Sequence, residues 1–273
     1  MYIVWFQITR DAISNKIKLG GEQDVQISWM EDIRKSNSEN ICGNEQCRQK
    51  IKILPRINFE TIIKTEDDVR NILNILVEVI DRYLFDGFTL ELSSHNWEVT
   101  KKLPGQLKEL RENIFIVLVI PPMASTKDDI GFSKAFMDLQ KNVDLFSVMT
   151  YDRNMGKEGA NSPIDWCEEI MTNLTYVGPI KHKLLMGIAM YGWIGENSMT
   201  STTMVKWLSS KNVTIQYKKD VAEHMFIENS SKKCYFPTPL SVYKRLSLVS
   251  RLGIEGIAIW ELGQMMPYLS DIL

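Results

Sequence analysis

The sequence is poor in the residues that build disulfide-linked or metal-bound scaffolds. Its 273 residues include only three histidines and four scattered cysteines, Cys42, Cys47, Cys167 and Cys234. This number and spacing exclude a disulfide-dense scaffold. No second cysteine or histidine pair has the spacing of zinc ligands, so we expect no metal site. The sequence leaves open whether Cys42 and Cys47 are bridged or free.

Long apolar runs, phosphate-binding loops and an excess of one charge are missing as well. No run of 18 apolar residues exists, so no membrane insertion is expected. The chain has 32 basic and 34 acidic residues, and this balance gives it no strong attraction to nucleic acid. No glycine-rich loop follows the first apolar run, and we expect no nucleotide or other cofactor. The N-terminus lacks the basic region and the cleavage site of a signal peptide.

What the sequence does contain is an alternation of short apolar runs with amphipathic stretches. Seven runs are apolar on both faces, which is typical of parallel strands covered by helices. They lie within residues 2–8, 51–60, 84–98, 114–122, 144–152, 183–193 and 255–264. Polar and aromatic residues gather at their carboxyl ends, where barrel proteins build their sites. We therefore expect an α/β fold of the (β/α)8 TIM-barrel type, with one strand missing, rather than an open doubly wound sheet.

We expect residues 1–273 to form a single barrel domain with one insertion. Between residues 201 and 239 the pattern changes to a helix and two segments that alternate like a hairpin. This stretch is predicted to be a small α+β subregion inserted after strand seven.

Local signals also predict the ends of three helices. Thr65 and Asp68 have the spacing of a capping box, and Ser162 with Pro163 is typical of a helix start. Gly253 is a natural residue to end the helix before it.

The apolar run at residues 84–98 carries polar side chains near its end. Because side chains alternate along a strand, Thr89, Glu91 and Ser93 share one face, which would point into a barrel. A carboxylate there is costly unless it has a partner, and Tyr151 and Asp152 from a neighbouring strand end are the candidates. The alternative is that Glu91 is a purely structural carboxylate.

The segment FDGFTLELS resembles the signature strand of the family-18 glycoside hydrolases, the chitinases and chitinase-like lectins. That signature reads Asp-Gly-x-Asp-x-Asp-x-Glu. Asp86 and Gly87 match its start, while Thr89 and Glu91 replace the second and third aspartates. Ser93 stands where the family has its catalytic glutamate.

Other segments resemble the same family. MTYD resembles its sixth strand, MGIAMYG its seventh and GIAIWELGQ its last, where Trp260 would lie beneath the sugar. The resemblance implies that ligand-binding residues are Glu91, Met149, Tyr151, Asp152, Trp260 and Glu261. Trp5 and Trp193 would either widen this aromatic cleft or pack in the core.

The details of these segments resemble one subgroup most, the stabilin-interacting chitinase-like proteins of the chitinase-domain-containing protein 1 type. The subgroup implies a secreted or lysosomal location and an endocytic receptor as a partner. The resemblance also places residues 2–8 on the family's second strand. We therefore expect a barrel without its first strand and with two unpaired strand edges.

The resemblance implies a silenced hydrolase. Family-18 enzymes use the glutamate to protonate the leaving oxygen, while the acetamido group of the substrate attacks the anomeric carbon. A serine hydroxyl is far too weak an acid for this step, which contributes about 10²- to 10⁴-fold. We expect a non-catalytic lectin for oligosaccharide, with N-acetylglucosamine-containing chains as the candidate ligand. Two alternatives stay open: a weak hydrolase that uses Glu91, and a protein-interaction scaffold for the receptor.

Overall fold

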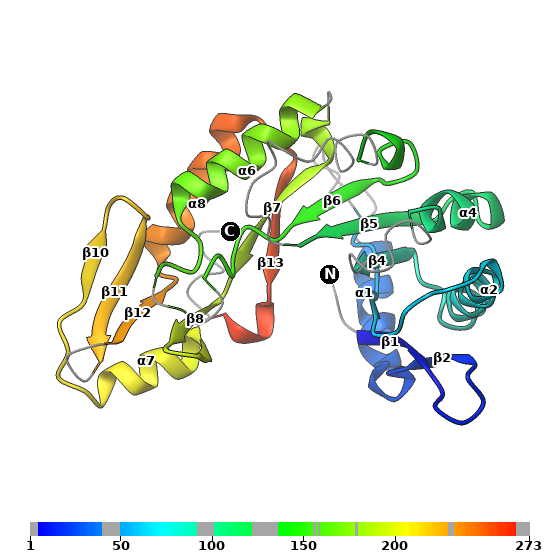
Figure 1. The fold of residues 1–273 in the computed structure, drawn as a ribbon, viewed down its shortest axis with the longest axis horizontal. Helices are drawn as coiled ribbons and strands as arrows, with labels where there is room; N and C mark the ends of the chain where they lie inside the picture. Colours follow the sequence, from blue (N-terminus) through cyan, green and yellow to red (C-terminus); the bar gives the residue numbers. More distant parts are fainter. Residues whose placement is uncertain are drawn as a thin grey trace. The chain divides into compact units, whose positions relative to one another are not determined.

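The computed structural model describes residues 5–39, 50–91, 101–121, 136–154, 157, 159–177, 180–228 and 232–265. The chain forms two compact units. The first comprises residues 1–119 and 135–145, and the second comprises residues 120–134 and 146–273. Figure 1 labels most elements of both units.

The first unit builds a mixed sheet in the order β5-β4-β3-β1-β2. Strands β1, β3, β4 and β5 are parallel to one another, and β2 is antiparallel to β1. These strands are β1 (Trp5–Arg10), β2 (Ile17–Gly20), β3 (Arg56–Phe59), β4 (Gly87–Glu91) and β5 (Phe115–Ile120). The helices of this unit are α1 (Ile27–Glu39), α2 (Glu66–Tyr83) and α4 (Leu103–Leu110).

The edge of the first strand is paired, which corrects the expectation of an open edge there. Strand β2 runs antiparallel to β1, with Gln7 opposite Gly20 and Arg10 opposite Ile17. The chain reverses between them through a turn in which the Asn15 amide donates to the Asp11 carbonyl. Because β2 supplies backbone partners for this part of β1, the risk that an unpaired edge carries is reduced.

The Asp-Gly pair that opens the signature strand has a structural role. The Asp86 carboxylate accepts a hydrogen bond from the Ile53 amide at 2.7 Å, and Asp144 does the same for the Ile116 amide. A Cβ atom at Gly87 would lie 1.8 Å from the Phe115 carbonyl oxygen. Asp86 and Gly87 therefore fix the start of β4 against its neighbours.

Helix α2 begins with the predicted capping box. The Thr65 hydroxyl accepts from the Asp68 amide at 3.1 Å, and the Asp68 carboxylate accepts from the Thr65 amide at 3.2 Å. The same carboxylate accepts from Arg10 at 2.9 Å. The Arg10 guanidinium, opposed by partial burial, lowers the pKa of Asp68.

Asp68→Asn is expected to lower the free energy of unfolding by about 1–2 kcal/mol at neutral pH, because the cap and the ion pair are both weakened. Because the folded pKa lies below the unfolded value near 3.8, the contribution of Asp68 is complete above that value. It is lost as the pH falls through the folded pKa. Urea denaturation at neutral pH and at about pH 3 measures the difference. An equal difference at both pH values would contradict the ion-pair origin.

The second unit builds a parallel sheet in the order β13-β7-β6. Its strands are β6 (Leu145–Val148), β7 (Leu184–Ala189) and β13 (Gly256–Trp260), and its long helices are α6 (Ile164–Val177) and α8 (Pro239–Leu252). Ile188, Met190 and Val242 form a buried cluster between this sheet and α8. Helix α8 ends at Gly253 in the left-handed conformation, as predicted.

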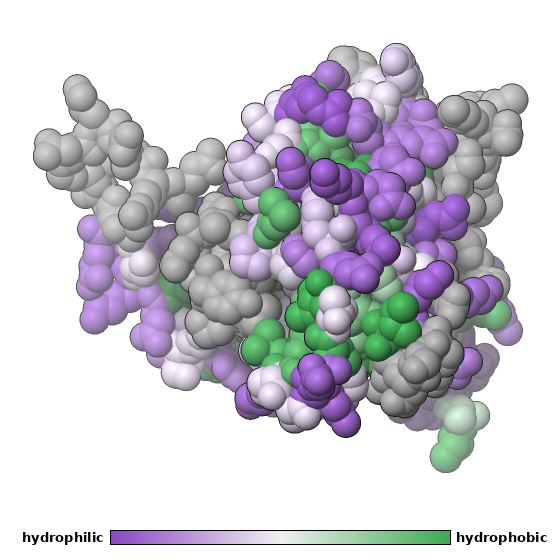
Figure 2. Space-filling model, turned by 90° about the vertical axis from the view of Figure 1, so that its left-hand side faces the viewer, coloured by the Kyte–Doolittle hydropathy of each residue, from purple (hydrophilic) through white to green (hydrophobic). Residues whose placement is uncertain are grey.

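An antiparallel sheet in the order β10-β11-β12-β8-β9 belongs to the same unit. Its elements are β8 (Tyr191–Ile194), β9 (Asn197–Thr200), α7 (Ser201–Ser209), β10 (Gln216–Lys218), β11 (Glu223–Glu228) and β12 (Lys232–Phe236). The predicted hairpin is β11 and β12, while β8 and β9 precede Ser201. Phe226, Phe236 and Met204 are buried together, with Trp207 of α7 packed against them. On the face shown in Figure 2, hydrophilic residues surround smaller apolar areas.

Two further predictions concern this unit. The run at residues 183–193 is two strands, because Met190 leaves the parallel sheet and its carbonyl accepts from Ser201. The helix start predicted at Ser162 and Pro163 agrees with α6, which begins at Ile164, and the Ser162 hydroxyl also donates to the Thr150 carbonyl at 2.6 Å. Cys167 and Cys234 are buried free thiols. Cys42 and Cys47 lie outside the described residues.

Candidate functional site

Asp152 follows β6 and is held by two side chains from β8. The Tyr191 hydroxyl donates to Asp152 Oδ1 at 2.6 Å, and the Trp193 indole Nε1 donates to the same oxygen at 3.1 Å. Burial, and then the bond to Asp152, raise the pKa of Tyr191 well above its ordinary value. Tyr191 therefore stays a hydrogen-bond donor at any physiological pH. Asp152 Oδ2 has no contact of this kind among the described hydrogen bonds.

Aromatic side chains surround this carboxylate. Tyr151, Ala189 and Tyr191 form a buried cluster against which Met149, Trp193 and Trp260 pack. Tyr151 meets Tyr191 edge to face at 6.3 Å between centroids, and Tyr191 meets Trp193 in the same way at 6.2 Å. Such pairs fix ring orientation beyond simple burial. We call Tyr151, Tyr191, Trp193 and Trp260 the aromatic wall. Together with the Asp152 carboxylate, it suits a ligand with both hydroxyl groups and apolar faces.

Gly187 of β7 allows Tyr151 to lie where it does. A Cβ atom at this position would be 2.4 Å from the Val148 carbonyl oxygen and 2.8 Å from Tyr151 Cε1. The Thr150 hydroxyl donates to the Gly187 carbonyl at 2.7 Å. This bond holds the segment after β6, which carries Tyr151, against β7.

Gly187→Ala is expected to destabilise the fold by about 1–3 kcal/mol, because the added methyl overpacks the strand against β6 and Tyr151. Thermal denaturation measures the loss. Gly256→Ala is the matched control on the neighbouring strand β13, since a Cβ atom there would lie 3.7 Å from Leu185, an ordinary contact. Equal melting temperatures for the two variants would contradict the close approach at Gly187.

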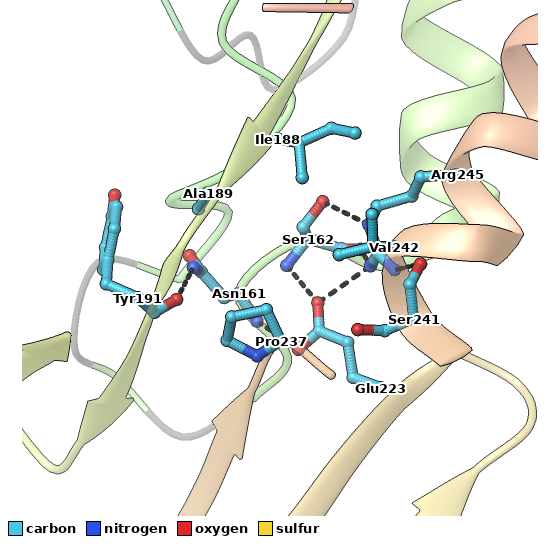
Figure 3. A pocket seen from close by; sticks show the side chains of 10 residues that line it. All are labelled: Asn161, Ser162, Ile188, Ala189, Tyr191, Glu223, Pro237, Ser241, Val242 and Arg245. Carbon is cyan, nitrogen blue, oxygen red and sulfur yellow. Dashed lines mark hydrogen bonds and ion pairs between the residues drawn. The ribbon is translucent and has the colours of Figure 1, made fainter. Parts of the chain in front are cut away.

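A buried polar cluster lies near Tyr191 (Figure 3). Arg245 of α8 and Glu223 of β11 form an ion pair at 3.0 Å, and both side chains are 4% exposed. Burial raises the pKa of Glu223, while Arg245 and two backbone amides oppose this effect by stabilising its carboxylate. A cavity of about 10 Å³ lies among these residues, lined also by Ala189 and Tyr191. It is far too small for a sugar ring.

Glu91 lies at the end of β4 in the first unit. Arg56 of β3 donates to its Oε2 through both Nε, at 2.7 Å, and Nη2. The Arg56 side chain is 7% exposed and that of Glu91 is 29% exposed. The prediction that Glu91 needs a partner is confirmed. The partner is Arg56 and not Tyr151 or Asp152, the candidates that the sequence offered.

The predicted residues are thus placed as follows. Met149, Tyr151, Asp152 and Trp260 come together in the second unit. Glu261 follows Trp260, and its carboxylate accepts from Gln264 at 3.3 Å. Ser93 and the side chain of Trp5 lie outside the described residues. In the described part of the chain, no group of acidic, histidine or cysteine side chains could hold a metal ion, and no helix could cross a membrane.

Sequence reasoning missed four residues of this arrangement, namely Tyr191, Asn161, Glu223 and Arg245. For Tyr191 a signal exists, because it alternates with Trp193 in AMYGW and both side chains must share one face. No local signal marks the other three, which act through partners distant in the chain.

The parallel strands, covering helices and added antiparallel sheet define a chitinase-like α/β fold, and solved structures agree. A class V chitinase from Pseudomonas fluorescens is 17% identical, with a TM-score of 0.76 over 98% of this chain and 88% of that one. A class V chitinase from Nicotiana tobaccum in complex with NAG4 is 13% identical, with a TM-score of 0.76 over 98% and 88%. The Bacillus cereus spore cortex-lytic enzyme SleL is 17% identical, with a TM-score of 0.73 over 98% and 64%.

Residues 21–264 match the model of the glycosyl hydrolases family 18. The chain belongs to this family. The fold class predicted from the sequence, a TIM-barrel type with an α+β insertion, is confirmed.

Proposed function

We propose that this protein is a non-catalytic chitinase-like lectin that binds N-acetylglucosamine-containing oligosaccharide at the strand ends carrying Tyr151, Asp152 and Trp260. The observation that carries the proposal is the Asp152 carboxylate, fixed by Tyr191 and Trp193 within an aromatic wall. Pyranose rings present apolar C–H faces that pack on aromatic rings. Their hydroxyl and acetamido N–H groups donate to a fixed carboxylate.

The proposal that catalysis is lost rests on two positions of the signature strand, Ser93 and Glu91. Ser93 occupies the place of the family's proton donor. The nearest replacement in the signature strand, Glu91, accepts two hydrogen bonds from the Arg56 guanidinium. General acid catalysis needs an acidic group within reach of the leaving oxygen. The serine hydroxyl is too weak an acid, and the Glu91 carboxylate is engaged by Arg56.

The first test measures binding and turnover on the same protein. Calorimetric titration with chitotetraose is expected to give saturable binding that Asp152→Ala weakens. Chromatography of the same mixture after prolonged incubation is expected to show intact tetrasaccharide only. Absence of binding would refute the lectin.

The second candidate, a weak hydrolase that uses Glu91, is separated by a fluorogenic chitobioside. We expect no release above the buffer blank. Release that disappears in Glu91→Gln, in a variant whose melting curve shows that it is still folded, would establish the hydrolase and overturn the non-catalytic assignment. The folding control is needed because Glu91 also pairs with Arg56.

The resemblance to the stabilin-interacting subgroup extends the proposal to a secreted or lysosomal protein with an endocytic receptor as a partner. A receptor scaffold and a lectin are separated by a glycan array. A lectin gives glycan signals that depend on the aromatic wall, whereas a scaffold gives none and still binds the receptor.

A further inference from the structure

We infer that Asn161 is a positioning residue for Asp152, and that Glu223 of the antiparallel sheet anchors it. This inference rests on the proposed role of Asp152 in binding sugar. Neither residue belongs to the segments that resemble the family's signature, and both are buried.

The backbone of Asp152 needs support from outside. Its φ is +61°, in the left-handed region that residues other than glycine seldom adopt. The Asn161 side-chain Oδ1 accepts from the Asp152 amide at 2.9 Å. This bond holds the peptide of Asp152 in the turn that aims its side chain at Tyr191 and Trp193.

The same asparagine also fixes the donor side of that contact. Its Nδ2 donates to the Tyr191 carbonyl at 3.2 Å (Figure 3), while the Tyr191 hydroxyl donates to the Asp152 carboxylate. One amide group therefore ties the backbones of both members of the pair. Asparagine suits this position because its amide presents a donor and an acceptor side by side.

Glu223 in turn holds the backbone of Asn161. Its carboxylate accepts from the Asn161 amide at 3.1 Å and from the Ser162 amide at 2.6 Å. Arg245 neutralises the buried carboxylate and also donates to the Ser162 carbonyl. The antiparallel sheet and α8 thus reach the sugar-binding carboxylate through one short chain of hydrogen bonds.

The test compares Asn161→Ala with Asn154→Ala. Asn154 is the matched control because its Nδ2 donates to the Ala160 carbonyl at 2.9 Å in the same loop without contacting Asp152. The ligand-free readout is the indole ¹H–¹⁵N resonance of Trp193, assigned with Trp193→Phe, which reports its bond to Asp152. We expect this resonance to shift in Asn161→Ala and to stay in place in Asn154→Ala.

The second readout is the affinity for chitotetraose. Loss of the positioning bond is expected to weaken binding about three- to tenfold. In an Asp152→Ala background, Asn161→Ala is expected to have no further effect, since coupled residues are not additive. A merely structural role would give additive losses and would overturn the inference.

The outcomes separate this inference from the proposed function. A shifted resonance in a protein that binds no chitotetraose would sustain positioning and refute the lectin. Binding with an unchanged resonance in folded Asn161→Ala would refute positioning alone. If Asn161→Ala does not fold, Asn161→Asp replaces it, because that side chain keeps the acceptor for the Asp152 amide and loses only the donor to the Tyr191 carbonyl. A shifted Trp193 resonance then supports the tie to both backbones, and an unchanged resonance overturns it.

Discussion

Arg245→Met is expected to lower the free energy of unfolding by about 3–5 kcal/mol, because it leaves the buried carboxylate of Glu223 without its cation. Arg245 is 3% exposed, and its guanidinium donates to Glu223, Ser162, Ala222 and Ser241. Methionine fills much of the volume but replaces none of these bonds. Urea denaturation followed by circular dichroism measures the loss.

Arg251→Met is the matched control for this prediction, because it removes an ion pair from the same helix at the surface. Arg251 donates to both carboxylate oxygens of Glu168, at 2.6 and 2.7 Å, and both side chains are well exposed. Exposed pairs contribute little, so we expect little change. Similar losses for the two variants would show that burial of the Arg245 pair does not govern its contribution.

Trp260→Ala is expected to weaken chitotetraose binding by about 30-fold or more, the loss typical of a central aromatic contact. Trp260 ends β13 and packs against the cluster of Tyr151, Ala189 and Tyr191. Its replacement removes the largest apolar face on that strand end, while Trp260→Phe retains part of it. Calorimetric titration of both variants gives the ratio.

Tyr176→Ala is the control for Trp260→Ala, because it removes an aromatic ring that is 82% exposed on α6 and packs in no cluster described above. Its affinity is expected to equal that of the unmodified protein. Melting curves must first show that Trp260→Ala is folded. Undiminished binding by the folded variant would mean that the ligand does not rest on this ring.

The parts of the fold that were predicted correctly depend on neighbours in the chain. The capping box of Thr65 and Asp68 and the end of α8 at Gly253 each involve a few consecutive residues. The local amino-acid sequence is therefore sufficient to predict them. The expected hairpin of β11 and β12 is of the same kind. Where a prediction failed, as for a single strand at residues 183–193, a contact from outside the segment decided the structure, since the Met190 carbonyl accepts from Ser201.

The same distinction between local and distant partners applies to the candidate site. The aromatic and acidic residues at strand ends were visible because parallel strands deliver their carboxyl ends to one edge. The partner of Glu91 was not, since Arg56 lies 35 positions away and only the register of β3 against β4 brings the two together.

The sequence by itself determined the alternation of strands and helices and the family, and it is the source of the proposal that a serine stands at the position of the proton donor. Only the tertiary structure decided which groups hold Asp152 and Glu91 in place. The physical reason is the separation of these partners along the chain. Asn161 bonds to Tyr191, 30 positions away, and to Glu223, 62 positions away. Arg245 bonds to Ser162, 83 positions away. Such pairs leave no periodic pattern in the chain, because their spacing is set by how strands and helices pack.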